Sequence, residues 1–253
     1  MPYLSLNHPI AKSIPEKDTQ QIIKAITEHW TANNIFCPVC WSALDKHKVD
    51  KPINDLFCID CSNDFELKAS KWKFSKMLPA WSYQKAVEAI ENKPMHLFVL
   101  KYSQDYTITN FLVVPKYFFT SDIVKRRPNA LKGRPNYFMS DIDFSIIPES
   151  WKIHYISDWK YKTRTEILEE WNKVRFLEKE KSSSKGWIFD TMICIEKLNK
   201  KVFSLQDMYD FENELKLKHP ENNNIKPKIR QQLQFLRDKW YLEFVSSGKY
   251  RVL

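Results

Sequence analysis

The chain has 253 residues, of which 43% are hydrophobic and 14% aromatic, and it carries a formal net charge of +9. This apolar content can fill a core, which excludes global disorder and allows one large domain, or a medium domain plus a small one. The basic balance favours an anionic partner, most commonly a nucleic acid. The longest apolar runs are strand-sized, so no membrane span of about 20 apolar residues is expected.

The part of the chain before residue 180 mixes helix and strand patterns. Apolar positions with helical spacing predict a helix from Ile22 to Trp30, capped by Asp18. Strands are predicted over residues 95–102, 107–114 and 152–156. A second helix is predicted over 163–176, and the charged, serine-rich run 178–185 is predicted to be a linker.

The segment after this linker has a different pattern, of short helices followed by a hairpin. Helices are predicted over 187–198, over 205–217 after a Ser204–Asp207 cap, and along an apolar face from Ile225 to Leu236. Two apolar segments flank Gly248, which is expected at the tip of a terminal hairpin. Three helices and a hairpin describe a winged helix, a form of the helix-turn-helix.

Charge favours DNA binding by this second part, because 14 basic and 9 acidic residues follow from Lys181 onward. The alternative is a helical unit for dimerisation or packing.

Two CxxC pairs predict a metal site. They are separated by 17 residues, a spacing typical of zinc sites, and comprise Cys37, Cys40, Cys58 and Cys61. Two residues between thiolates let one tight turn present both sulfurs to one ion, and two such turns complete a tetrahedron. Four thiolates leave no open position, so the zinc would be structural. A redox CxxC or an iron–sulfur cluster is a weaker alternative. The fifth cysteine, Cys194, is expected to be a buried free thiol.

Acidic residues flank the second cysteine pair. Asp55 precedes Cys58, and the segment Phe65-Glu66-Leu67-Lys68 follows Cys61. If both flanks are strands, the cysteine turn is their hairpin tip, and the period of two puts Glu66 and Lys68 on one face near Asp55. Two carboxylates could hold Mg²⁺ beside a scissile phosphate, and the lysine could orient water or offset charge. This D-x10-E-x-K pattern has the form of the PD-(D/E)XK nuclease motif, but an ordinary surface salt bridge is the alternative.

Longer segments carry a family resemblance. They are CPVC at Cys37, DLFCIDCSNDFELK at Asp55, NFLVVPKYF at Asn110, SSKGW at Ser183, FSLQDMYDFENELK, NNNIKPKIRQQLQFLRDK and GKYRVL. Over nearly its full length, the chain resembles the DpnI-type methyl-directed restriction endonucleases. The resemblance implies an α/β fold: a PD-(D/E)XK restriction-endonuclease-like core with a four-cysteine zinc site over residues 1–180, then a small winged-helix domain over 186–253.

The resemblance also implies Mg²⁺-dependent cleavage of double-stranded DNA at sites that contain N6-methyladenine, with GATC as the expected sequence. Carried onto this chain, the catalytic residues are Asp55, Glu66 and Lys68, and the magnesium ligands are Asp55, Glu66 and Leu67. The protein is expected to be a cytoplasmic monomer that binds adenine-methylated DNA and no membrane.

One region departs from the family. The segment 132–141 differs and is shorter, where the family has a tryptophan implicated in sensing the methyl group. Tyr137 is the position that best matches this tryptophan, since an aromatic ring could pack on a methyl in the major groove; a core or loop aromatic is the alternative. In the winged helix, the expected DNA-binding residues are Asn223, Asn224, Lys226, Lys228, Arg230, Gln231, Gln234, Lys249 and Arg251.

Two further functions stay open on the residues. The first is a non-catalytic DNA-binding regulator made of a zinc module and a winged helix. The second is a related nuclease with a different methylation or sequence preference, which the altered 132–141 segment allows.

Overall fold

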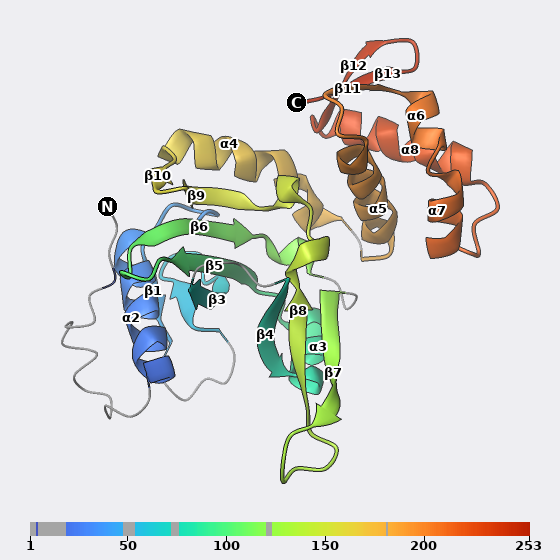
Figure 1. Ribbon diagram of the computed structural model, residues 1–253. Helices are drawn as coiled ribbons and strands as arrows, with labels where there is room; N and C mark the ends of the chain where they lie inside the picture. The colour runs from blue at the N-terminus through green and yellow to red at the C-terminus, as the bar shows by residue number, and fades with distance from the viewer. Residues whose placement is uncertain (1–3, 5–18, 48–53, 72–75, 120–122, 181) are drawn as a thin grey trace. The chain divides into compact units, whose positions relative to one another are not determined.

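The computed structural model describes Leu4 and residues 19–47, 54–71, 76–119, 123–180 and 182–253 (Figure 1). The predicted cap Asp18 lies outside these residues. The chain forms two compact units, Met1–Trp171 and Asn172–Leu253. The division falls inside helix α4 (Arg164–Arg175). This helix confirms the one predicted over 163–176. None of the described helices is both long and apolar enough to cross a membrane.

The first unit is built on a curled sheet. Its described strands lie in the order β1-β2-β3-β5-β6-β9-β10. Their bounds are β1 (Leu44–Lys46), β2 (Leu56–Cys58), β3 (Asp64–Lys71), β5 (His96–Tyr102), β6 (Ile108–Val114), β9 (Ile153–Ser157) and β10 (Lys160–Tyr161). β3 and β5 pair in parallel, whereas the other neighbours are antiparallel. The three strands predicted from sequence are confirmed as β5, β6 and β9.

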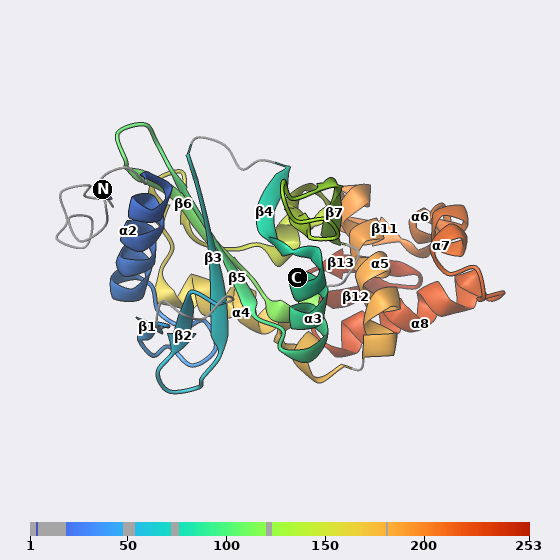
Figure 2. The same ribbon diagram turned by 90° about the horizontal axis from the view of Figure 1, so that it is seen from below.

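Aromatic side chains fill the core around this sheet. Phe98 of β5 stacks on Phe65 of β3 with ring centroids 4.5 Å apart, and it packs on Phe111 of β6 at 5.1 Å. The predicted N-terminal helix is α2 (Thr19–Asn34), and its Trp30 packs on Phe111. α2 also contacts β1 and β3, and it lies beside β3 in both views (Figures 1 and 2). β3, which carries Glu66 and Lys68, is therefore anchored to its neighbours by packed aromatic side chains.

A second sheet stands in a part of the chain where the sequence analysis predicts no strands. It has the order β4-β8-β7 and packs on α3 (Tyr83–Asn92). Its strands are β4 (Met77–Ser82), β7 (Val124–Ala130) and β8 (Phe138–Asp143). β7 is mostly exposed and contains Pro128, which an edge strand tolerates because one side of its backbone needs no partner. Short turns of 3₁₀ helix complete the unit: η1 (Lys116–Phe118), η3 (Phe144–Ile146) and η4 (Glu149–Trp151).

The second unit has the winged-helix elements. Its helices are α5 (Ser182–Leu198), α6 (Leu205–Tyr209), α7 (Glu212–Lys218) and α8 (Ile225–Asp238). β11 (Val202–Ser204), β12 (Leu242–Ser246) and β13 (Lys249–Val252) form a sheet in the order β11-β13-β12. α5 packs against α8 (Figure 2). Gly248 lies at the tip of the β12–β13 hairpin with φ +68°, a conformation that favours glycine.

Two local expectations were wrong in this unit, and one was confirmed. The predicted linker 178–185 is largely helical, because η5 (Phe176–Lys179) and the first turn of α5 occupy it. The predicted helix 205–217 is two helices, because a tighter turn of the 3₁₀ type interrupts it at Phe211. There the Phe211 N–H donates to Met208 O, three residues back. Cys194 is a buried free cysteine, as expected.

Candidate metal centre and active site

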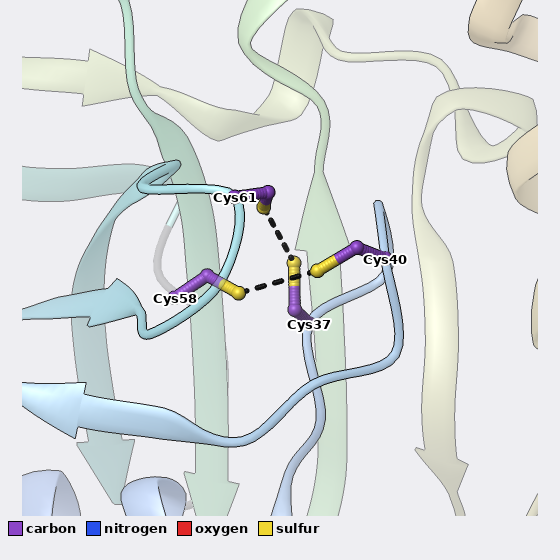
Figure 3. A group of neighbouring side chains, drawn as sticks. All are labelled: Cys37, Cys40, Cys58 and Cys61. Carbon is purple, nitrogen blue, oxygen red and sulfur yellow. Dashed lines mark hydrogen bonds between the residues drawn. The ribbon is translucent and has the colours of Figure 1, made fainter.

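Four cysteines from two turns converge at one point. Figure 3 shows the sulfurs of Cys37, Cys40, Cys58 and Cys61 directed toward one another. All four lie within 4.8 Å of each other, with Cys37–Cys61 at 3.6 Å and Cys40–Cys58 at 3.3 Å. Sulfurs about 2.3 Å from a zinc ion at the corners of a tetrahedron would stand about 3.8 Å apart. Among the described residues, this is the one group of three or more potential ligands so gathered, and it could bind zinc.

The two cysteine turns share one backbone design. In the first, Trp41 N–H donates to Cys37 O at 2.9 Å, and in the second, Ser62 N–H donates to Cys58 O at 3.1 Å. The residue after each second cysteine is left-handed, with φ +74° at Trp41 and +56° at Ser62. Each turn therefore directs two sulfurs to the same side. The second turn joins antiparallel β2 and β3, so the predicted cysteine-tipped hairpin is confirmed.

A buried network orients a donor toward one sulfur. His96 Nδ1 accepts Lys116 N–H at 3.1 Å, so the ring proton lies on Nε2, which faces Asn63 Oδ1 at 3.3 Å. Burial, together with the charge of Lys116, lowers the pKa of His96 well below its usual value and keeps the ring neutral. Lys116 Nζ also donates to Asn63 Oδ1, at 2.8 Å. The amide NH₂ of Asn63 is thereby directed to Cys61 Sγ, 3.2 Å away.

The thiols themselves differ in acidity. Burial raises the pKa of Cys37 and of Cys58 above the usual value. Burial also opposes ionisation of Cys40, but hydrogen bonds from the backbone and hydroxyl of Ser42 outweigh it and lower the pKa of Cys40 to about 7. A cation would be needed to hold all four as thiolates, because buried thiolates without a countercharge repel one another.

Beside this hairpin, Asp55 sits at the entrance to β2. Its N–H donates to Phe65 O at 3.0 Å, and its Oδ2 accepts Leu67 N–H at 2.8 Å. The side chain of Asp55 is only 8% exposed, and its other oxygen pairs with Lys24 of α2 at 2.9 Å. Asp55 is therefore held against the backbone of β3 next to the Glu-x-Lys segment.

Glu66 and Lys68 lie on one face of β3, as the period of two predicts. Lys68 Nζ donates to Glu66 Oε1 at 2.7 Å, while Asn54 N–H donates to Oε2 at 3.1 Å. Asn54 has φ +75°, a left-handed conformation that asparagine tolerates. Burial raises the pKa of Glu66, and the ammonium of Lys68 offsets part of that effect. The structure thus brings Asp55, Glu66 and Lys68 together.

Helix α2 contributes two charged side chains that sequence reasoning missed. Lys24 pairs with both Asp55 and Glu28, the latter at 3.5 Å. Burial, and then the negative charge of Asp55, raise the pKa of Glu28 to about 7. In the sequence these residues form an ordinary i, i+4 pair on an amphipathic helix, and no local signal connects them to Asp55.

Two protein-family models match this sequence. The sequence matches the model of DpnI, described as the Dam-replacing family, over residues 3–180. It matches the model of DpnI_C, the Dam-replacing HTH domain, over residues 183–252. The chain belongs to the DpnI, or Dam-replacing, family. Membership in this family supports a methylation-dependent restriction endonuclease with a DNA-binding helix-turn-helix domain.

Within the helix-turn-helix domain, the predicted DNA-binding residues lie on or just before α8 and on the terminal hairpin. Most are exposed, and Lys228 and Arg251 are half-buried. Several are already held by neighbours: Lys226 pairs with Glu212 at 3.2 Å, and Arg251 with Glu243 at 2.9 Å. Arg230 Nε donates to the Oη of Tyr209, an aromatic residue with no local sequence signal for a role in binding. These basic side chains therefore have defined orientations, Lys226 and Arg230 in the first half of α8 and Arg251 on the hairpin.

Tyr137 lies in the loop between β7 and β8. Its N–H donates to Arg134 O at 3.2 Å, and the Arg134 guanidinium stands 5.7 Å from its ring centre. The ring lines an open pocket of about 610 Å³ together with Phe138, Arg126 and residues of α3. The structure therefore places Tyr137 in a loop of the second sheet of the first unit and not on β3.

Proposed function

We propose that this protein is a type II restriction endonuclease that cleaves double-stranded DNA at sites containing N6-methyladenine, with GATC as the expected sequence. The observation that carries the proposal is that Asp55, just before β2, meets Glu66 and Lys68 of β3 in a member of the DpnI family. We propose a nuclease domain over residues 1–180 and a winged helix over 186–253, acting as a cytoplasmic monomer.

Two metals fit the donor sets of the first unit. The four cysteines offer only soft thiolates, so we propose a structural zinc there. Asp55, Glu66 and Leu67 would hold Mg²⁺, a hard cation that accepts one or two carboxylates and keeps several waters. When bound, Mg²⁺ polarises the scissile phosphate and lowers the pKa of a bound water.

The protein's own residues do the remaining work. Lys68 donates one of its three N–H groups to Glu66, and the other two could donate to a phosphate oxygen or to the attacking water. Its positive charge offsets the negative charge that develops on the phosphate as water adds to phosphorus and the bond to the leaving oxygen breaks. The Leu67 N–H and the Asn54 N–H hold Asp55 and Glu66 in place, so neither carboxylate must reorganise during the reaction.

Two surfaces would bind the DNA. Asn223 and Asn224 precede α8 and lie where a recognition helix meets base edges, while the basic residues of α8 and Lys249 would contact phosphates. The β7–β8 hairpin exposes Lys125, Arg126 and Arg127 in the first unit. We propose that Tyr137, beside this basic strand, senses the methyl group.

A plasmid comparison tests the proposal. Plasmid grown in hosts with and without adenine methylation is incubated with the protein and Mg²⁺, and cutting is scored on a gel. We expect cutting of the methylated plasmid only. Equal cutting of both plasmids would show that cleavage does not depend on methylation. Cutting of neither plasmid would contradict the proposed nuclease function.

Matched variants separate catalysis from binding. Lys68→Ala and Asp55→Ala should abolish cleavage while methylated DNA is still bound, whereas Lys71→Ala, at the exposed end of β3, should still cut. Salt-dependent binding by the wild type without any strand scission would instead support a non-catalytic regulator. Tyr137→Ala should lower the preference for methylated over unmethylated DNA, and an unchanged preference would remove Tyr137 from the methyl site.

A further inference from the structure

A β-bulge in β4 lies next to the proposed active site. Pro79 pairs with Asp141 and Ser82 with Met139, so three steps along β4 match two along β8. The extra residue falls at Ala80–Trp81. Ser140 is fully buried, and its hydroxyl donates to Trp81 O at 2.8 Å, which fixes the irregular carbonyl. Bulges re-aim side chains and are over-represented beside active sites.

The bulge residue Trp81 contacts the catalytic lysine. Lys68 Nζ stands 5.0 Å from the centre of the Trp81 ring, within the range of a cation–π interaction. On its other side, the same ammonium donates to Glu66 at 2.7 Å. The Lys68 side chain is 20% exposed, so a route to a phosphate stays open.

Apolar side chains pack closely against Glu66 and Trp81. Glu66, Trp81 and apolar side chains including Met95 and Leu97 enclose a cavity of about 10 Å³. That volume is at or below what one water requires. The Glu66 side chain is only 5% exposed, so its ion pair with Lys68 lies where the dielectric constant is lower than in bulk water, which strengthens the pair.

We propose that Trp81 is a positioning residue for Lys68, holding its ammonium beside Glu66 and toward the scissile phosphate. The inference rests on the proposed nuclease function. A lysine is a flexible four-carbon stem, and a single carboxylate contact leaves the ammonium free to rotate about that contact. The Trp81 face is a second anchor. Glu66 would also bind a divalent cation, which would weaken its interaction with the Lys68 ammonium. Trp81 would bind no cation other than that ammonium.

Replacing tryptophan by increasingly fluorinated tryptophan at position 81 tests this directly. Fluorine withdraws charge from the ring face with little change of shape, so a role in packing alone would not respond. We expect kcat for cleavage of methylated DNA to fall stepwise to about one tenth with the tetrafluoro ring, while KM stays near the wild-type value. Trp81→Leu should show a similar loss in kcat, and Trp81→Phe should restore part of it.

The control is the same series at Trp159, a half-exposed residue next to β10, which should leave kcat unchanged. A kcat that does not vary along the Trp81 series would overturn the proposal. A second readout does not need cleavage: the NMR signal of the Lys68 ε-methylene should be shifted upfield by the ring, and Trp81→Leu should remove that shift. If the wild type cuts no DNA, the proposed function fails; an unshifted Lys68 signal would also overturn the positioning role.

Discussion

Replacing Asn63 by aspartate would distinguish the role of its Oδ1 oxygen from the role of its NH₂ group. The remaining carboxylate can still accept from His96 and Lys116, as Asn63 Oδ1 does at 3.3 and 2.8 Å. What disappears is the NH₂ donor that stands 3.2 Å from Cys61 Sγ. The variant therefore removes one N–H···S hydrogen bond from the cysteine cluster while it keeps the rest of the buried network satisfied.

The expected change in zinc affinity follows from the two charged groups next to position 63, Cys61 and Lys116. The new carboxylate repels the Cys61 thiolate and attracts the Lys116 ammonium, and at about 4 Å with an effective dielectric constant of about 20 each term is about 4 kcal/mol. The two have opposite signs and largely cancel. The lost hydrogen bond to a charged acceptor remains, and it contributes about 1.5–3 kcal/mol. We therefore expect the dissociation constant for zinc to rise about 10- to 100-fold.

Competition with a chromophoric zinc chelator measures this constant for the loaded protein. The control is Asn172→Asp, which makes the same charge change at an exposed position of α4. A dissociation constant for Asn63→Asp within about twofold of the wild type would refute the view that this amide stabilises a metal-bound thiolate. Circular dichroism of both zinc-loaded variants would check that the fold is retained.

Two further predictions concern stability. Phe98 is fully buried between Phe65 and Phe111. Phe98→Ala should therefore lower the free energy of unfolding by about 3–5 kcal/mol in urea denaturation. A loss below about 1 kcal/mol would show that the aromatic core does not determine the stability of the first unit. Asp207→Ala breaks the capping box with Ser204 and should destabilise the second unit by about 1 kcal/mol at neutral pH. The hydrogen bond from Lys200, then those from Ser204, lower the pKa of Asp207 in the folded state. Its stabilisation is therefore fully present above the unfolded pKa of about 3.9 and is lost as the pH falls through the folded value, so the melting temperatures of wild type and variant should converge in acid; a constant gap would contradict the linkage.

Much of the candidate site could be predicted because its signals are local. The CxxC spacing predicts two turns that each present two sulfurs, and the four sulfurs do meet. The period of two along β3 predicts Glu66 and Lys68 on one face, and their 2.7 Å contact agrees. The helices and hairpin of the second unit likewise follow from apolar spacing and from Gly248. In each case, the residues within one turn, strand face or hairpin are a few positions apart in the chain.

Other parts could not be predicted because distant segments create them. Only the packing of α2 against the sheet brings Lys24 and Glu28 to Asp55. Only the pairing of β4 with β8, with its extra residue, places Trp81 on Lys68. The β7–β8 hairpin was missed because β7 is a polar edge strand with no buried face to impose alternation. Which chemical groups the protein has, and how neighbouring ones are spaced, follows from its amino-acid order. Which charges and rings surround those groups depends on the fold, because burial and pairing over long chain separations set these contacts.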